Sequence, residues 1–165
     1  MKRLYVTTLF DHEVCQTKDN VEYEIKCERL NRHNAGLKLS LMWNIACLGR
    51  VWHYYITDAS GKRIHSSFVV RGKSKFTFVG ERDIEIGPCE TDPDYRGHNI
   101  YPYVLSHIIE EELDEKGKAY MVVDDDNPAS IRGILKAGFR PTGDIITVNR
   151  LKQYRITGKD TGIEK

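Results

Sequence analysis

The spacing of hydrophobic positions changes near residue 83 of this 165-residue chain. Before that point, the clearest apolar pattern is typical of strands. Residues 51–57 alternate aromatic and β-branched side chains, residues 58–61 have turn chemistry, and residues 64–70 form a second apolar stretch. Together these segments predict a β-hairpin.

The rest of the first half has weaker patterns. Residues 2–10 have strand composition, and residues 11–20 are polar and predict a loop or a short helix. Residues 21–30 place apolar side chains at helical spacing and predict a helix. Residues 37–48 are apolar without interruption, and such a run fits a buried strand and a buried helix equally well. Residues 73–78 are basic and predict an exposed link or an edge strand.

Residues 83–91 predict a strand that is interrupted by Gly87-Pro88. Proline cannot donate to a strand ladder, and a glycine within a strand often marks a bulge. We therefore expect this strand to part from one neighbour near Pro88. Such a gap leaves unpaired backbone groups that a ligand can use. A plain edge strand is the alternative interpretation.

After this strand, helices alternate with strands. Residues 100–116 place apolar side chains on one face of a helix, and Pro102 fits its first turn. The preceding turn, residues 95–100, brings free N–H groups to the positive end of the helix dipole, which suits the pyrophosphate of a nucleotide-like cofactor. The further expected elements are a strand at 119–123, a helix at 129–137 and an antiparallel pair at 145–148 and 153–156. This order predicts one α/β domain, residues 1–165, built on a mixed sheet.

Composition narrows the classes of function. With 25 basic and 24 acidic residues, the chain lacks the bulk charge that favours nucleic acid or an anionic membrane. No apolar run approaches the roughly 20 residues of a membrane span, and no signal-peptide pattern follows the first residues. The four cysteines are too far apart in sequence for a metal knuckle. We therefore expect reduced thiols, no bound metal and a cytoplasmic location.

Motifs in the second half resemble those of the GNAT superfamily, the GCN5-related acyl-CoA N-acyltransferases. D-P-D-Y-R-G at residues 92–97 follows a strand and precedes a helix, like the start of that family's R/Q-x-x-G-x-G/A pyrophosphate loop. Asn127 followed by Ser130, and then by Gly138-Phe139, is similar to the signature of the family's second cofactor helix. One helix and one strand separate the two motifs, as in the family. The resemblance covers residues 83–139.

The resemblance implies a GNAT-like fold, with a mixed, mostly antiparallel central sheet that is flanked by helices and splayed at the strand containing Gly87-Pro88. It also implies acetyl-CoA as the acyl donor. The implied cofactor-binding residues are Cys89, Thr91, Arg96, Gly97, His98, Asn99, Ile100, Tyr101, Asn127 and Ser130.

The implied chemistry needs a general base, because a protonated amine must lose a proton before it attacks the thioester. Glu85 is the first candidate for this base, because it lies six residues before Thr91, as the base does in the histone-acetyltransferase branch of the family. Glu90 is the second candidate. The family's oxyanion donor is a backbone N–H, which falls near residues 89–91 here.

Three positions depart from the family pattern. Asn99 and Tyr101 stand at the two small-residue positions of the pyrophosphate loop, which makes the loop atypical. Asparagine tolerates a left-handed backbone, so we expect Asn99 to keep the turn, whereas the ring of Tyr101 must point away from the phosphates or lie beside the cofactor. The tyrosine that many members use as general acid is replaced here by Ile134. The remaining candidates for the acid are Tyr101, Tyr103, Cys89 and His98.

The expected function is the transfer of an acetyl group from acetyl-CoA to a primary amine of a small molecule, with a nucleotide-linked amino sugar as one candidate acceptor. Aromatic side chains that offer a wall for this acceptor are Trp43, Trp52, Tyr54, Tyr55 and His65. Basic side chains that would meet an anionic acceptor are Arg63, Arg71, Lys73 and Lys75. The alternatives are a non-catalytic acyl-CoA-binding or interaction module and a protein N-acetyltransferase. We expect no nucleic-acid or membrane partner, and a homodimer is one assembly to test.

Overall fold

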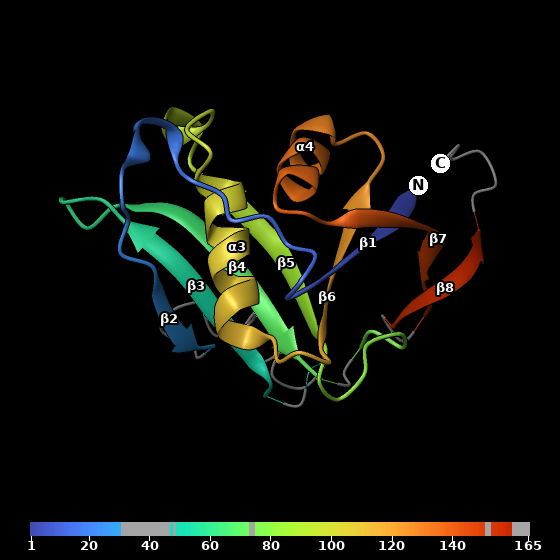
Figure 1. The fold of residues 1–165 in the computed structure, drawn as a ribbon. Helices are drawn as coiled ribbons and strands as arrows, with labels where there is room; N and C mark the ends of the chain where they lie inside the picture. The colour runs from blue at the N-terminus through green and yellow to red at the C-terminus, as the bar shows by residue number, and fades with distance from the viewer. Residues whose placement is uncertain (31–46, 48, 73–74, 151–152, 160–165) are drawn as a thin grey trace.

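The computed structural model describes residues 1–30, 47, 49–72, 75–150 and 153–159. These residues form an eight-stranded sheet with helices packed against it (Figure 1). The strands are β1 (Lys2–Thr8), β2 (Lys26–Arg29), β3 (Val51–Thr57), β4 (Arg63–Arg71), β5 (Ile84–Thr91), β6 (Lys118–Asp124), β7 (Arg140–Val148) and β8 (Tyr154–Lys159). The helical segments are η1 (Lys18–Asn20), η2 (Pro93–Tyr95), α3 (Ile100–Glu112) and α4 (Pro128–Lys136).

The strand order in the sheet is β2-β3-β4-β5-β6-β1-β7-β8. All neighbouring strands are antiparallel except β5 and β6. These two run parallel because α3 carries the chain from the end of β5 back to the start of β6, and parallel neighbours need such a crossover. The structure confirms the predicted mixed, mostly antiparallel α/β sheet.

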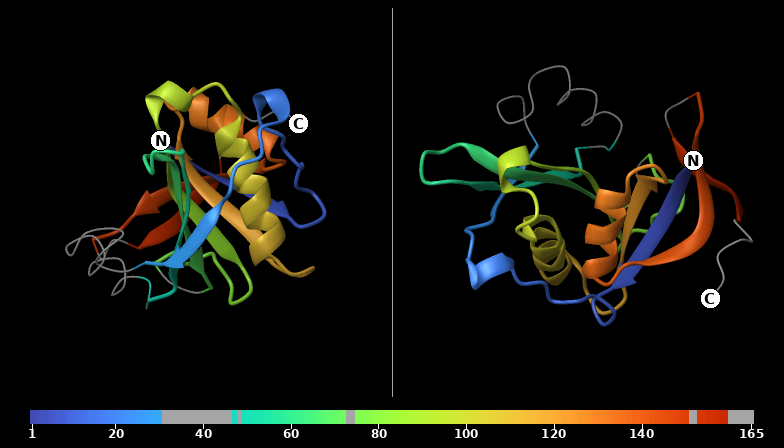
Figure 2. Two further views of the ribbon diagram at one scale, coloured as in Figure 1. Left: turned by 90° about the vertical axis from the view of Figure 1, so that its left-hand side faces the viewer. Right: turned by 90° about the horizontal axis from the view of Figure 1, so that it is seen from above.

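The two described α-helices, α3 and α4, lie on the same face of the sheet (Figure 2). The apolar face of α3 predicted from the sequence is buried there in the main core, which also contains Ile84 and Ile86 of β5 and Met121 and Val123 of β6. Burial of these side chains is the main contribution that holds α3 against the sheet. A second, smaller core lies on the opposite face and contains Leu30, Cys47, Val51, Val70, Phe76 and Val79.

The predicted β-hairpin is confirmed as β3 and β4. Its turn is fixed by Asp58, whose side chain accepts hydrogen bonds from the backbone N–H of Ser60 at 2.9 Å and of Lys62 at 3.0 Å. An aspartate that bonds to its own following backbone is the usual chemistry of such turns. The closing antiparallel pair is confirmed as β7 and β8, and both strands extend beyond the predicted bounds.

The helix predicted at residues 21–30 is wrong, because the structure has β2 at Lys26–Arg29 there. β2 pairs with the edge of β3, and its side chains alternate between half-buried and exposed. A charged edge strand carries a weak apolar pattern, so pairing with β3 decided the conformation.

Helix α3 ends at Glu112 rather than at residue 116. The Asp114 side chain accepts hydrogen bonds from the N–H groups of Lys116 and Gly117, and these bonds fold the residues after the helix into a turn.

Two further expectations concern segments that the structure describes only in part. The run at 37–48 and its Trp43 lie outside the described residues, apart from Cys47, and so does Lys73. In the part of 73–78 that is described, Phe76 makes an isolated bridge to Tyr154 and no strand forms.

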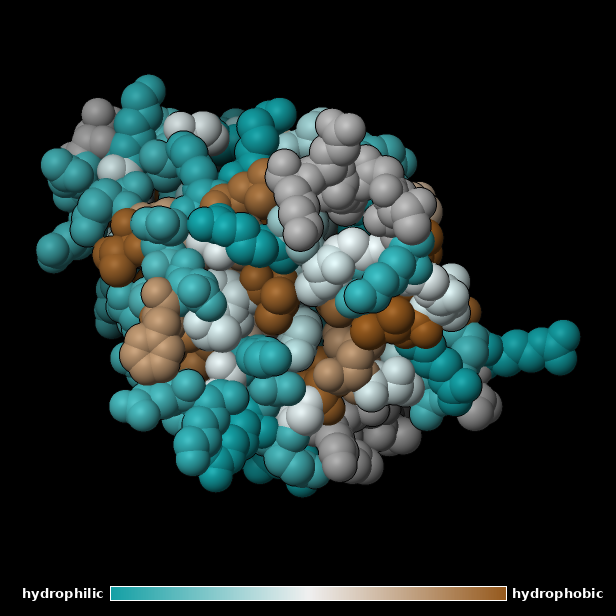
Figure 3. Space-filling model, turned by 45° about the vertical axis from the view of Figure 1, so that its right-hand side comes forward, coloured by the Kyte–Doolittle hydropathy of each residue, from teal (hydrophilic) through white to brown (hydrophobic). Residues whose placement is uncertain are grey.

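Hydrophobic and hydrophilic residues are interspersed on the face shown in Figure 3, where the apolar ones gather in small groups between polar ones. None of the described helices is long and apolar enough to cross a membrane. Among the described residues, no group of histidine, cysteine and carboxylate side chains has the arrangement of a metal site.

Candidate acyl-CoA site

Strands β5 and β6 pair only at their beginnings. The paired positions are Ile84 with Ala119 and Glu85 with Tyr120, and the two strands separate after them. We call the place where they separate the fork. On its other side β5 stays paired with β4 as far as Thr91, so β5 is not a plain edge strand. The predicted parting of this strand from one neighbour is therefore confirmed, and the neighbour is β6.

Gly87 and Pro88 form a bulge in β5. Ser67 of β4 pairs with Cys89, and Val69 of β4 pairs with Ile86. Gly87 and Pro88 of β5 therefore stand opposite the single β4 residue that lies between Ser67 and Val69. The extra residue brings both Ile86 and Cys89 onto the helix side of the sheet, where they contact the main core. The bulge thereby aims the Cys89 side chain into the space beyond the fork.

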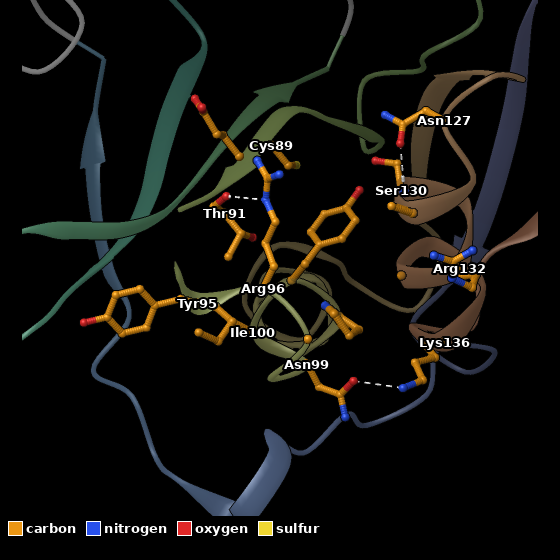
Figure 4. A pocket seen from close by; sticks show the side chains of 16 residues that line it. Cys89, Thr91, Tyr95, Arg96, Asn99, Ile100, Asn127, Ser130, Arg132 and Lys136 are labelled. Atoms are coloured by element: carbon orange, nitrogen blue, oxygen red, sulfur yellow. Dashed lines mark hydrogen bonds between the residues drawn. The ribbon is translucent and has the colours of Figure 1, made fainter. Parts of the chain in front are cut away.

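A cavity of about 570 Å³ opens at the end of β5, between the first turn of α3 and the face of α4 (Figure 4). Cys89 and Thr91 line it from β5, and Asn127 and Ser130 line it from the start of α4 (Figure 4). Its remaining lining residues are Glu90, Tyr95, Arg96, Gly97, Asn99, Ile100, Tyr101, Pro102, Ala129, Arg132, Gly133 and Lys136. The structure thus gathers into one cavity all the sequence-predicted site residues except Glu85 and His98.

The turn before α3 has the geometry of an anion site. Asn99 caps the helix in the left-handed conformation, with φ 59° and ψ 17°, which confirms the conformation expected of it. The first internal bond of the helix is donated by Tyr103 N–H to the Asn99 carbonyl at 3.1 Å. The N–H groups of Ile100 and Tyr101 precede that bond, and Pro102 has none, so these free donors point out of the helix end at the positive end of its dipole.

Cationic side chains surround this helix end. Arg96 donates from Nε to the Thr91 carbonyl at 3.1 Å, and Lys136 donates from Nζ to Asn99 Oδ1 at 2.8 Å (Figure 4). These contacts hold both charges at the cavity, and Arg132 lines the same wall from α4. Lys136 and Arg132 were not identified from the sequence. The signal for them was the spacing of four residues between Arg132 and Lys136, which places two cationic side chains on one face of α4.

Asn127 is the N-cap of α4, where its Oδ1 accepts from the N–H of Ser130 at 3.1 Å. Pro128 at the first helical position fits the same helix start. The asparagine and serine of the motif therefore position α4 beside the cavity as well as lining it. His98 lies outside the cavity with an exposed side chain, and its carbonyl accepts a hydrogen bond from the N–H of Lys18 at 2.8 Å.

The two candidate carboxylates lie in different environments. Glu85 stands at the fork, and its cross-strand partner Val70 belongs to the second core, so its side chain lies on the sheet face opposite the helices. It is only 4% exposed, and among the described residues its Oε2 atom has no hydrogen-bond partner. Burial raises the pKa of Glu85 to about 8, although the charge of Lys75 acts in the other direction. Glu90 is exposed and lines the cavity itself.

A buried histidine organises the β4 side of the fork. His65 contacts Thr91 Oγ1 through Nδ1 and Ser67 Oγ through Nε2, each at 2.8 Å. Burial lowers the pKa of His65 to about 4, so the ring is neutral at neutral pH. Sequence reasoning placed His65 only among the aromatic wall residues. The polar run from His65 to Ser67 in an otherwise apolar strand was the signal for this network.

The other predicted wall residues have partners of their own. Arg71 lies over the Trp52 ring, with 3.7 Å from its guanidinium carbon to the ring centroid, and pairs with Glu112 at the end of α3. Tyr54 also donates to Glu112. These contacts tie β3 and β4 to α3, and they engage Arg71 in the fold. Arg63 lies 5.2 Å from the Tyr55 ring centroid.

The arrangement of sheet, fork and cavity is that of the GNAT fold, and comparisons with known proteins agree. No family model and no curated protein matches the sequence. Solved structures match the fold, among them a GNAT-family acetyltransferase from Colwellia psychrerythraea, with a TM-score of 0.58 and 14% identity over 86% of this chain and 52% of that one.

Two further similar structures carry more specific names. Mutant forms of the spermidine/spermine N-acetyltransferase from Vibrio cholerae have a TM-score of 0.52 and 14% identity over 79% of this chain and 90% of theirs. A GCN5-related glucosamine N-acetyltransferase region of a fungal multi-domain β-N-acetylglucosaminidase has a TM-score of 0.51 and 12% identity over 85% of this chain and 19% of that one. The present chain spans about half the length of the Colwellia protein. At these identities the likeness establishes the fold.

Proposed function

We propose that the protein transfers an acetyl group from acetyl-CoA to a primary amine of a small molecule by direct attack of the amine on the thioester. The observation that carries this proposal is the fork between β5 and β6, whose free strand edge leads from the anion site at the start of α3 into the sheet. The GNAT fold of the chain supports an acyl-CoA substrate.

The residues around the cavity fit such a substrate. The N–H groups at the start of α3 and the charges of Arg96, Arg132 and Lys136 suit a diphosphate. The unpaired edge of β5 beyond Glu85 offers backbone donors and acceptors to the extended, amide-containing arm of acyl-CoA, as an edge strand does to an added strand. A free N–H on this edge near residues 89–91 is the candidate donor to the oxyanion.

Glu85 is the better placed candidate for the general base. It stands at the fork on the face away from the helices, so the amine would approach from that face while the thioester enters from the helix side. A pKa of about 8 suits a base that works near neutral pH. The amine nitrogen gives a proton to the Glu85 carboxylate, directly or through water, and forms a bond to the carbonyl carbon. The carbon–sulfur bond then breaks, and its electron pair leaves with the sulfur.

The acceptor class is supported by the names of proteins with a similar fold, which describe acetylation of spermidine or spermine in one case and of glucosamine in another. Polyamines and amino sugars, including nucleotide-linked ones, are therefore the first acceptors to assay. The alternatives remain a non-catalytic acyl-CoA-binding module and a protein N-acetyltransferase. Each makes a different prediction for the same assay.

The test combines binding with turnover. Acetyl-CoA should raise the melting temperature of the protein through ligand linkage, and thiol release should then be measured with a panel of polyamines, amino sugars and peptides. Turnover of a small amine supports the proposal. Binding without turnover on the panel favours the binding module, and turnover of peptides alone favours the protein acetyltransferase. No thermal shift at millimolar acetyl-CoA would refute an acyl-CoA function altogether.

A matched pair of variants tests the base. Glu85→Gln should lower kcat by about 100-fold or more, the usual contribution of a general base, with little change in the affinity for acetyl-CoA. Glu90→Gln is the comparison variant, because Glu90 is the second candidate for the base and is exposed at the cavity, whereas Glu85 is buried at the fork. The reverse order of effects would move the base to Glu90.

A further inference from the structure

The ring of Tyr101 fills the space between the two helices. A Cβ atom added to Gly133 of α4 would lie 2.5 Å from Tyr101 Cδ1 and 2.8 Å from Cε1. These distances are too short for real atoms, so the ring packs directly on the backbone of α4 where that helix has no side chain. Because residue 133 is a glycine, α4 leaves room for a large residue at position 101. The pyrophosphate loop of the GNAT pattern has a small residue at that position.

The hydroxyl at the end of this ring lies at the fork. It is 4.0 Å from the sulfur of Met121, the first residue of β6 beyond the last paired position, Tyr120. Burial raises the pKa of this hydroxyl well above its usual value, and the neighbouring side chains of Cys89 on β5 and Ser130 on α4 act on it as well, Cys89 raising it and Ser130 lowering it. The hydroxyl thus stands between the separating strands, on the helix side, and its residue lines the cavity.

The other candidates for a proton donor are less suitable. Ile134 carries no polar atom and is 1% exposed in the main core. Tyr103 directs its hydroxyl to the carbonyl of Tyr23 at 3.4 Å, and His98 lies outside the cavity. Cys89 faces the same space as Tyr101, and burial raises the pKa of its thiol to about 12, but a thiol is a weaker hydrogen-bond donor than a phenol hydroxyl. Tyr101 is the remaining candidate.

We propose that the Tyr101 hydroxyl is the hydrogen-bond donor to the sulfur of the acyl-CoA substrate, and that it protonates this sulfur as the thiolate leaves. The proposal rests on the proposed function. When the carbon–sulfur bond breaks, the electron pair goes to sulfur, the O–H proton of Tyr101 follows it, and the phenolate takes a proton back from solvent through the cavity. Glu85 and Tyr101 then act from opposite faces of the sheet on the two ends of the same reaction.

Equilibrium binding tests this role without any acceptor. Calorimetry should compare coenzyme A with desulfo-coenzyme A, which lacks only the sulfur. We expect the wild-type protein to bind coenzyme A several-fold more tightly than the desulfo compound, in line with one hydrogen bond of about 1 kcal/mol. Tyr101→Phe keeps the ring against Gly133 and should remove this preference. Tyr103→Phe removes a hydroxyl from the same helix that points elsewhere, and should keep it.

Kinetics give the second readout once an acceptor is known. Tyr101→Phe should lower kcat by about 10- to 100-fold and leave the KM for acetyl-CoA nearly unchanged, because the donor acts chiefly as charge develops on sulfur. Unchanged discrimination between the two compounds, or unchanged kcat, in Tyr101→Phe would overturn this proposal while the acetyltransferase function stands. Failure of the wild-type protein to bind either compound would overturn the proposed function, and this inference with it.

Discussion

Glu85 and Tyr120 form the last paired position between β5 and β6, and the two strands separate immediately beyond them. A buried carboxylate therefore marks the point where the sheet opens. Its Oε2 atom has no hydrogen-bond partner among the described residues, and such an atom is costly to leave buried when charged. A position of this kind stabilises the fold less than an apolar residue would, which is expected where a site serves chemistry.

The pH dependence of stability tests the environment of Glu85. Its pKa is raised from 4.5 in a reference peptide to about 8 in the fold. The stabilisation linked to this group is fully present below about pH 4.5, and it is lost as the pH rises to about 8, because the unfolded chain ionises first. Denaturant unfolding should be measured for the wild-type protein and for Glu85→Gln across this range. As the pH rises, the free energy of unfolding of the variant should increase relative to that of the wild-type protein. A constant difference across this range would contradict a raised pKa.

The histidine network gives a pH dependence at the acid end. The pKa of His65 is lowered from 6.5 to about 4 by burial, so the stability of the fold should fall as the pH drops from 6.5 towards 4. The pKa of a second buried histidine, His53 on β3, is also lowered to about 4, again chiefly by burial. Replacing either histidine with Gln should remove part of this acid sensitivity, and replacing both should remove more. If unfolding free energies of all the variants fall equally with pH, other groups cause the acid sensitivity.

The left-handed cap of α3 can be tested by a pair of substitutions at one position. Asn99 has a φ of 59°, which glycine adopts freely and alanine does not. Asn99→Ala should destabilise the protein by about 1 kcal/mol, whereas Asn99→Gly should change its stability by only a few tenths. Both remove the acceptor of Lys136, so the difference between them isolates the backbone. Thermal unfolding of the two variants is the measurement, and equal stabilities would contradict the assignment.

The contact between Gly133 and Tyr101 gives a prediction with a defined sign. Alanine is favoured over glycine in a helix by about 1 kcal/mol, yet the added Cβ would meet the tyrosine ring at 2.5 Å. Gly133→Ala should therefore destabilise the wild-type protein, by about 1–3 kcal/mol for an overpacked site. In a Tyr101→Ala background the same change should be neutral or stabilising. A double-mutant cycle measures this coupling, and additive effects would show that the ring does not pack there.

The sequence predicted the second half of the fold better than the first. The break at Gly87-Pro88 and the left-handed Asn99 follow from local backbone chemistry, so their outcomes could be stated in advance. β2 could not be predicted because its charged residues follow no clear period and become a strand only through pairing with β3. In that segment the tertiary partner determines the structure.

The sequence predicted which residues form the site better than it predicted where their side chains lie. Ten residues chosen from the motifs line one cavity, because the motif spacing places them at the ends of adjacent elements. That Glu85 lies on the far face of the sheet and that the Tyr101 hydroxyl reaches the fork both depend on the register of β5 against β4 and on the fit of the ring to α4. Cross-strand register and helix packing are long-range properties that the local pattern does not specify.

Nuclear magnetic resonance of the labelled protein during titration with acetyl-CoA tests the central claim most directly. The account predicts that the largest amide shifts fall on residues 86–91 along the free edge of β5 and on residues 97–101 at the start of α3, and that they saturate together. The amides of β7 and β8, two and three strands away from β6 in the sheet, serve as the internal control. Saturable shifts that fall elsewhere, or none at millimolar acetyl-CoA, would contradict an acyl-CoA site at the fork.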